Sequence, residues 1–277
     1  MRNRLFYIIL CFCLITTAKG QLRNYAKISE LNIGVGHMEY MNTVSVPSGL
    51  PGTSTHFEYT GGRINSNNPK REFDFFIRAD YAYLMRKTII SDINIPYHHF
   101  ELKFGTKWAW DIPVSIQNFR LSAGAGISFN ALAGYNKKLN FSCEPHEIMY
   151  PYGNWYVCPD VHLGLNYKLN KISLQGGVSI PVFVVGFFQK YEYFEYYIND
   201  TSKFLKYVIT PNSFAFPTNF LYLKSFISAT YMFNKTKTTQ YNMKISLNQE
   251  YLHSSINNNI EMKNNYGVSL ALIILKK

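Results

Sequence analysis

Charged side chains at alternate positions of apolar segments are the residues of this chain most able to do chemistry. Ten share this spacing: Asp74, Arg78, Asp80, Arg86, Glu101, Lys103, Lys107, Arg120, Lys244 and Glu250. Enclosed together, groups of both signs can form a binding or catalytic network. Buried charges must also pair, so a structural salt-bridge plug is the alternative, and we favour it. The lumen charge network that we predict comprises Asp74, Arg78, Asp80, Glu101, Lys103 and Arg120.

Two cysteines, Cys143 and Cys158, lie in one stretch rich in Pro, Gly and Tyr. In an exported chain, two thiols in a loop favour a disulfide that staples the loop. Closing a loop of about 15 residues contributes roughly 3 kcal/mol. The alternative is a metal site that also uses His146 and His162, although neither spacing nor ligand density matches a zinc site. We predict the disulfide, no metal site and no cofactor.

A second pattern, His253-Ser254-Ser255, closes an alternating segment in which Tyr241, Ile245 and Leu247 are apolar. His253 and Ser255 are two residues apart, so in a strand they share that apolar face. The pattern resembles the His-x-Ser arrangement of the outer-membrane lipid A 3-O-deacylases, although Ile256 stands where that family usually has Asn. The resemblance implies His253 as general base, Ser255 as nucleophile on a membrane ester, and an acid such as Glu261 orienting the base. A His and a Ser at a strand end are also common residues beside a turn.

All of these residues depend on β-strands for their positions, and residues 71–86 form the clearest one. Phe73, Phe75 and Ile77 alternate with Asp74 and Arg78, and the period of two continues for about fifteen residues. Strands of soluble sandwiches are usually about 5 to 6 residues long, whereas a tilted strand needs roughly 9 to 11 to cross a bilayer. One apolar face and one charged face therefore favour a strand between lipid and a lumen.

The same alternation recurs along the chain and predicts ten strands, near residues 27–40, 56–62, 71–86, 99–110, 119–134, 161–167, 172–188, 220–233, 241–251 and 266–275. Pro181 disturbs the seventh. The connections alternate between longer and shorter, with extended loops at 42–55, 135–159 and 189–219 and a tight turn at 168–171. We therefore predict an all-β fold: a single antiparallel, up-and-down transmembrane β-barrel of about 10 strands (8 to 12), with both termini on the periplasmic side.

The first twenty residues have the layout of a secretory signal peptide, with Arg2 and Arg4 before an apolar run and Ala18-Lys19-Gly20 at its end. We predict a mature domain at residues 21–277. It has no stretch of 18 consecutive apolar residues, so transmembrane helices are excluded there. The net charge of +11 comes from dispersed Lys and Arg, which argues against nucleic acid and favours contact with outer-membrane lipids. Aromatic residues reach 17% of the chain, more than a soluble core of this size would readily bury.

The signal peptide, the alternating strands, the Tyr- and Asn-rich composition and the ending NNYGVSLALIILKK resemble the outer-membrane β-barrel proteins of Bacteroidetes-type bacteria. The resemblance implies a bacterial outer-membrane location. The sequence departs from many outer-membrane barrels at its last residues, Lys276 and Lys277, because those barrels end on an aromatic residue. We expect a structural role, or adhesion or ligand binding through loops 135–159 and 189–219. The alternatives are a lipid A deacylase-like membrane esterase and a narrow channel or ligand carrier. Open diffusion channels need about 16 strands.

Overall fold

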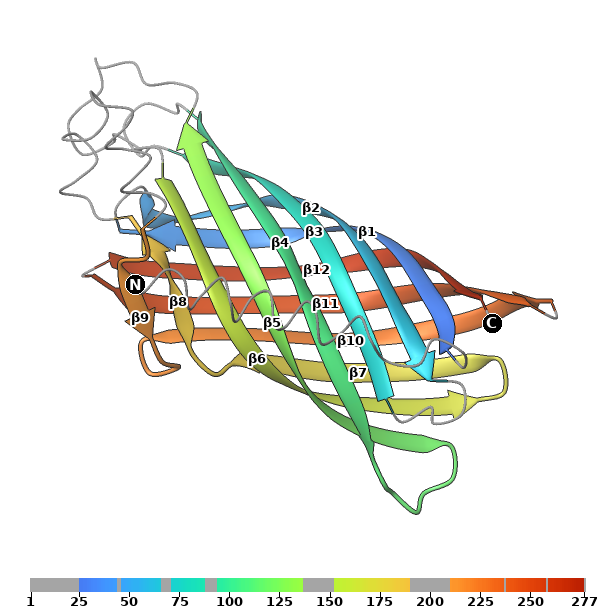
Figure 1. Ribbon diagram of the computed structural model, residues 1–277. Coiled ribbons are helices and arrows are strands. Elements are labelled where there is room, and N and C mark those ends of the chain that lie inside the picture. Colours follow the sequence, from blue (N-terminus) through green and yellow to red (C-terminus); the bar gives the residue numbers. More distant parts are fainter. Residues whose placement is uncertain are drawn as a thin grey trace.

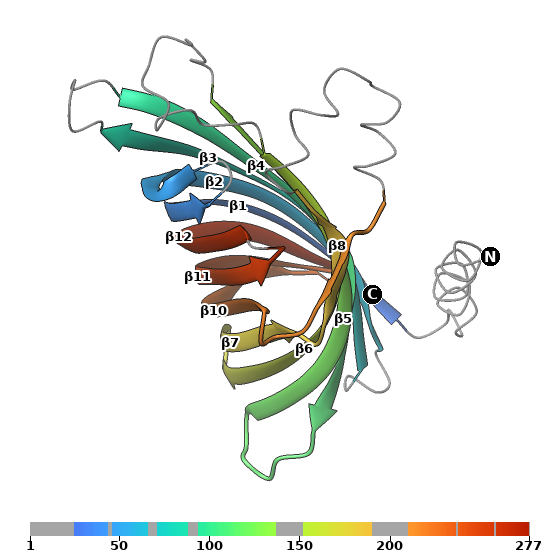
Figure 2. The same ribbon diagram turned by 90° about the vertical axis from the view of Figure 1, so that its left-hand side faces the viewer.

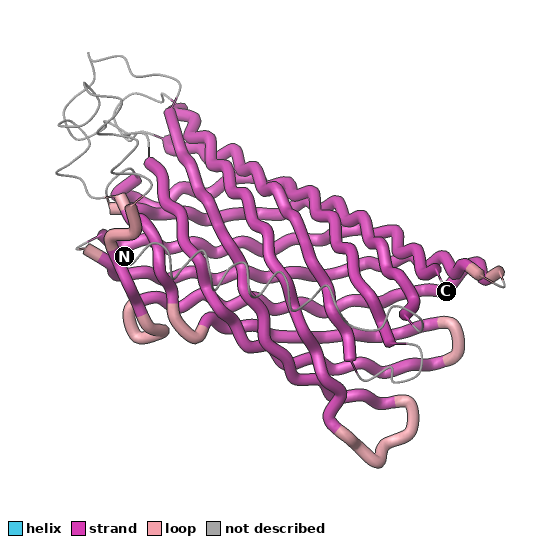
Figure 3. The backbone as a smooth tube through the Cα atoms, in the orientation of Figure 1, coloured by secondary structure: helices cyan, strands magenta, loops and turns pink. Residues whose placement is uncertain are grey.

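The computed structural model describes residues 25–43, 46–65, 71–87, 94–136, 152–189, 210–236, 238–257 and 259–276. Every regular element among them is a strand (Figure 3). No helix in these ranges has the length and apolar character needed to cross a membrane. The strands are β1 (Tyr25–Asn42), β2 (Val46–Asn65), β3 (Arg71–Lys87), β4 (Asn94–Ile112), β5 (Phe119–Asn136), β6 (Tyr152–Leu169), β7 (Ile172–Pro181), β8 (Val184–Phe188), β9 (Ser213–Ala215), β10 (Phe220–Lys235), β11 (Thr239–Ile256) and β12 (Asn259–Lys276).

Ten long strands close into an antiparallel barrel, as the sequence predicts. The order is β5-β4-β3-β2-β1-β12-β11-β10-β7-β6, and pairing of β5 with β6 completes the ring. Each strand pairs with its neighbours in sequence, except that β1 and β12 join the two ends of the chain. Figures 1 and 2 show the resulting long, tilted wall from the side and toward one end. Every strand of the ten-strand ring thus pairs with a neighbour on each side, the condition for a sheet to lie in lipid.

Side-chain direction in the wall follows the predicted alternation. Leu31, Ile33 and Val35 point outward and are 42 to 59% exposed, whereas Asn32 between them is buried. Phe75 and Ile77 on β3 also point outward, with Asp80 inside. Apolar side chains thus cover the outside and polar ones fill the inside, the reverse of a soluble protein.

Asparagines make several of the hairpin turns. Asn118, Asn170 and Asn257 have positive φ angles, between 51° and 64°, a conformation that Asn tolerates better than most residues. The tight turn predicted at 168–171 is present, at residues 170–171. It lies at the end of the barrel where β1 begins and β12 ends (Figure 1). We call this the terminal end, and the opposite end the far end.

The strands extend further toward the far end than predicted. β2 begins at Val46, β6 at Tyr152 and β12 at Asn259, so the long loop expected at 42–55 is a short connection and the one expected at 135–159 ends earlier. Pro51 and Pro96 did not end their strands. Pro51 pairs with β1 before the pairing of β2 with β3 begins, and Pro96 pairs with β3 before that of β4 with β5 begins. Proline lacks a backbone N–H to donate, so a strand tolerates it at a position that pairs with a neighbouring strand on one side only.

The predicted seventh strand is two strands. Pro181 ends β7, and β8 resumes at Val184 with the register against β6 shifted by one residue. The short strand β9, inside the loop expected at 189–219, pairs with β8. The ladder between β7 and β10 ends at the pair Ser179 and Lys224. The ten-strand wall is therefore interrupted at this point on its far half.

Candidate functional site

A network of charged side chains fills the middle of the lumen. Its members are Arg78, Asp80, Glu101, Lys103, Glu250, Lys263 and Tyr222, and we call them the lumen network. Glu250 is central: its carboxylate lies 2.9 Å from Arg78 Nη1, 2.8 Å from Lys103 Nζ and 3.1 Å from Lys263 Nζ. The Tyr222 hydroxyl donates to the same carboxylate at 3.0 Å. Three acids face three bases, so the network carries no net charge.

Contacts of the lumen network cross the full width of the barrel. Lys103 is on β4 and Glu250 on β11, five strands apart in either direction around the ten-strand ring. Lys263 on β12 meets Glu101 on β4 at 2.6 Å, across four strands. The Lys103 and Lys263 ammonium groups also lie over the Tyr222 ring from β10, at 5.7 and 5.4 Å from its centroid. Direct contact between opposite walls leaves no room there for an open pore.

A second set of contacts bridges the lumen nearer the far end. The Tyr40 hydroxyl and Asn154 Nδ2 each donate to the Glu261 carboxylate at 3.0 Å. Asn259 Nδ2 donates to the Tyr152 hydroxyl at 3.0 Å. β6, which carries Tyr152 and Asn154, is four strands from β12, which carries Asn259 and Glu261. We call these five residues the outer seal. Buried apolar clusters around Met38, Leu84, Phe188 and Leu252 fill the space beside it.

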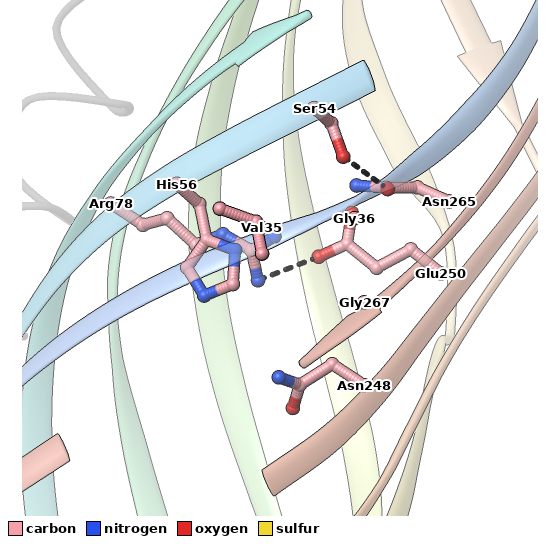
Figure 4. A pocket seen from close by; sticks show the side chains of 9 residues that line it. All are labelled: Val35, Gly36, Ser54, His56, Arg78, Asn248, Glu250, Asn265 and Gly267. Atoms are coloured by element: carbon pink, nitrogen blue, oxygen red, sulfur yellow. Dashed lines mark hydrogen bonds and ion pairs between the residues drawn. The ribbon is translucent and has the colours of Figure 1, made fainter. Parts of the chain in front are cut away.

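The half of the lumen nearer the terminal end is different. Among the described residues, the polar contacts there join strands at most two apart: Lys244 pairs with Glu30, and Arg120 with Asp111 at 3.6 Å. Phe226 faces inward over Gly177 and is still 41% exposed. We call this half the vestibule. A small polar cavity lies between it and the lumen network, lined by Ser54, His56, Arg78, Asn248 and Glu250 among others (Figure 4).

Of the residues expected in a charged lumen, the structure brings Arg78, Asp80, Glu101 and Lys103 together in the network. Arg120 lies apart from them near a terminal turn, where its side chain is 48% exposed and 3.6 Å from Asp111. Asp74 points inward, but it lies on the vestibule side of Arg78 and makes no ion pair within the described strands. The side chain of Arg86 is outside the described residues.

Two network members were missed by sequence reasoning. Lys263 precedes the predicted start of the last strand at residue 266, so it was taken for a loop residue. Extending the alternation of β12 backward places positions 261, 263 and 265 on the inner face, which is the signal that could have found it. Tyr222 was missed because aromatic residues were expected on the lipid face. Its side chain is 1% exposed and inside.

Comparison with known proteins identifies no close relative. No family model and no curated protein matches the chain. Solved structures match over nearly the whole length at low identity. The outer-membrane protease OmpT of Escherichia coli has 10% identity and a TM-score of 0.45, covering 91% of this chain and 95% of its own. The translocator domain of the autotransporter NalP from Neisseria meningitidis has 9% identity and a TM-score of 0.37, covering 97% and 96%.

The closed ring with an apolar outside and a polar inside is suited to one environment, a lipid bilayer. The chain is a transmembrane β-barrel protein. The even number of long strands places both termini at the terminal end. The two longest connections, 137–151 and 190–209, are at the far end, and because long loops of such barrels face the outside, we infer that the far end is extracellular and the terminal end periplasmic.

On this barrel, His253 and Ser255 share the outer face of β11. Ser255 is exposed and His253 is half-buried. Glu261, the acid expected to orient His253, is 2% exposed and inside the barrel, where Tyr40 and Asn154 bind it. Its strand neighbour is Ser254, whose side chain also points inward. The wall separates Glu261 from His253, because His253 is next to Ser254 in β11 and successive residues of a strand point to opposite faces. The three residues therefore do not form a triad.

Cys158 lies in strand β6 and not in a loop. Its Sγ is buried inside the barrel, 3.1 Å from Ser128 Oγ and 3.6 Å from Asn130 Nδ2. His162 is on the same inner face, with its ring over Gly124. Cys143 and His146 lie outside the described residues, so the disulfide stays a prediction. Within the described strands no group of three or more His, Cys, Asp or Glu side chains is arranged to hold a metal.

Proposed function

We propose that this outer-membrane barrel is closed to diffusion and acts through its extracellular end, as a structural or adhesive protein that binds an extracellular ligand or protein. The observation that supports this most is the contact of Lys103 with Glu250 across the widest part of the lumen. The outer seal adds a second closure between β6 and β12. A solute entering from outside would have to separate both sets of contacts.

Partner binding would then depend on the extracellular connections. The two longest segments between strands, 137–151 and 190–209, both join strands at this end and belong to the loops expected at 135–159 and 189–219. Both segments lie outside the described residues. The second contains the Tyr-rich run from Tyr191 to Tyr197, and clusters of aromatic residues often mark interaction sites. We also retain the resemblance to Bacteroidetes-type barrels as a proposal.

Two measurements test the proposal. In planar bilayers the purified barrel is expected to give no conductance steps, because the lumen network blocks ions. Steady open steps from the wild type would refute the closed lumen.

For adhesion, cells displaying the protein are compared with cells displaying variants in which 137–151 or 190–209 is replaced by a short Gly-Ser linker. Wild-type cells should bind at least one member of a panel of immobilised glycans and matrix proteins, and the variants should lose it.

The membrane esterase remains a second candidate because His253 and Ser255 share the outward face on which a lipid ester would lie. It lacks the predicted acid, since Glu261 points into the lumen. The test is release of acyl chains from lipid A by the wild type and by Ser255→Ala. Equal release, or none from either protein, removes this candidate.

A further inference from the structure

We propose that the inner wall of the vestibule, next to the lumen network, binds a small zwitterion that carries an apolar group, such as an aromatic amino acid, entering from the periplasm. The patch is built from three adjacent strands. His162 on β6, Ser179 on β7 and Lys224 on β10 are direct register partners in one row. The next row toward the periplasm contains Gly164, Gly177 and Phe226. Asp160 lies two residues from His162 on the same inner face.

Charges of both signs in this patch lack partners. Asp160 is 5% exposed, and its Oδ1 has no hydrogen-bond partner in the described structure. The buried Nδ1 of His162 has none either. Lys224 lies over the Tyr222 ring, 4.6 Å from its centroid, and within the described strands it has no carboxylate within 4.0 Å. A buried charge without a partner is costly, and a ligand with both an ammonium and a carboxylate group would satisfy Asp160 and Lys224 together.

The distance between the two charged residues suits a bridging ligand. Strands in a sheet lie about 4.8 Å apart, so β6 and β10, separated by β7, are roughly 10 Å apart. The lumen network provides no closer partner for Lys224, because Glu250, its register partner on β11, already contacts Arg78, Lys103 and Lys263. Asp160 and Lys224 thus face one space from opposite sides of the patch.

Phe226 provides the apolar part of the site. Its ring faces the lumen over Gly177 and is 41% exposed, although Ser228, the next inward residue of β10, is buried. A Cβ on Gly177 would lie 2.6 Å from Phe226 Cε1, so glycine is needed for the ring to rest on the wall. Its other register partner, Asn248, lines the small cavity beside Arg78 and Glu250 (Figure 4). An exposed aromatic ring inside a polar lumen offers a surface for stacking.

Three probes of the same size distinguish the charges: L-phenylalanine, 3-phenylpropionate, which lacks the ammonium group, and 2-phenylethylamine, which lacks the carboxylate. Binding to the full mature barrel in detergent micelles is measured by calorimetry or by ligand-observed NMR. L-Phenylalanine should bind most tightly. Lys224→Met should weaken binding of the two carboxylate probes about tenfold or more and leave the amine unchanged. Asp160→Asn should weaken the two ammonium probes and leave the carboxylate-only probe unchanged.

Phe226→Ala should weaken the binding of all three probes. The matched control is Ser173→Ala, on the inner face of β7 nearer the terminal end, and it should weaken the binding of none. Heat-dependent gel mobility verifies that each variant has folded. Three outcomes overturn the proposal: no binding of L-phenylalanine at millimolar concentration, equal binding of the three probes, which indicates partition into the micelle, or charge variants that do not separate the probes. None of these outcomes bears on extracellular binding, so failure here is distinguishable from failure of the proposed function.

Discussion

Replacing Glu250 by Gln tests the central role of this carboxylate in the lumen network. The substitution keeps the size and most of the packing of the side chain, and it removes the charge that faces Arg78, Lys103 and Lys263 at 2.8 to 3.1 Å. Three cations would then face only Asp80 and Glu101. The change thus isolates the electrostatic contribution from that of filling the lumen.

The expected loss of stability follows from the burial of the network. Side chains of Lys103, Glu101 and Lys263 are about 1% exposed, so water cannot replace the missing charge. Removing one partner of a buried ion pair typically costs about 3 to 5 kcal/mol, because the other charge stays buried without compensation. We expect a loss of this size for Glu250→Gln. Lys263→Met added to the same protein should restore part of it, since the remaining charges are again balanced.

Urea unfolding of the barrel refolded into lipid vesicles measures the effect, with the midpoint and slope fitted for each variant. The matched control is Glu39→Gln, on the outer face of β1. The Glu39 side chain is 59% exposed, and its ion-pair partner among the described residues is His37, at 3.9 Å, so a change within about 0.5 kcal/mol is expected. A loss below about 1 kcal/mol for Glu250→Gln would refute the reasoning, because the carboxylate would then be either hydrated or dispensable.

Other predictions concern the wall. Gly36→Ala should lower the free energy of unfolding by about 1 to 3 kcal/mol, because a Cβ would lie 2.5 Å from the Tyr266 carbonyl oxygen. Gly49→Ala should leave the free energy of unfolding in urea unchanged, because a Cβ there would have nothing within 4 Å. Ile245→Lys, on the lipid face of β11, should destabilise the barrel by about 2 to 4 kcal/mol if it lies near the bilayer midplane. The unheated protein should migrate differently from the heated one on a detergent gel, and identical mobility would contradict a closed barrel.

Alternation predicted the barrel well because the period of two has one cause throughout the chain: lipid on one side and a polar lumen on the other. Phe75 and Ile77 against Arg78 and Asp80 are enough to orient β3. Strand ends were predicted less well. Ile260 and Met262 point outward on the far part of β12 and are 39% and 36% exposed, but Asn264 interrupts the apolar alternation before Tyr266. β12 was therefore expected to start at residue 266 instead of 259.

The sequence could predict which charged residues enter the lumen, but not which of them pair with each other. The alternation of inward and outward positions alone identified Arg78, Asp80, Glu101 and Lys103 as inward residues. It could not show that Lys103 meets Glu250, since that contact depends on which strands face each other across the lumen and on their stagger. The triad hypothesis failed for the related reason that Glu261 follows the turn at Asn257. The register after this turn puts Glu261 opposite Ser254, and both side chains point inward.

The positions of the two closures determine what each end of the barrel can do. The outer seal and the lumen network both lie between the vestibule and the far end of the barrel. A ligand of the proposed patch around Lys224 and Phe226 would therefore enter from the terminal end, and an extracellular partner would meet the loops. Glu250 is the register partner of Lys224. A rearrangement of the lumen network would therefore change the surroundings of the Lys224 side chain directly. Weakening of the vestibule site by Glu250→Gln, with extracellular binding unchanged, is the result expected of two sites separated by a closed wall of ion pairs.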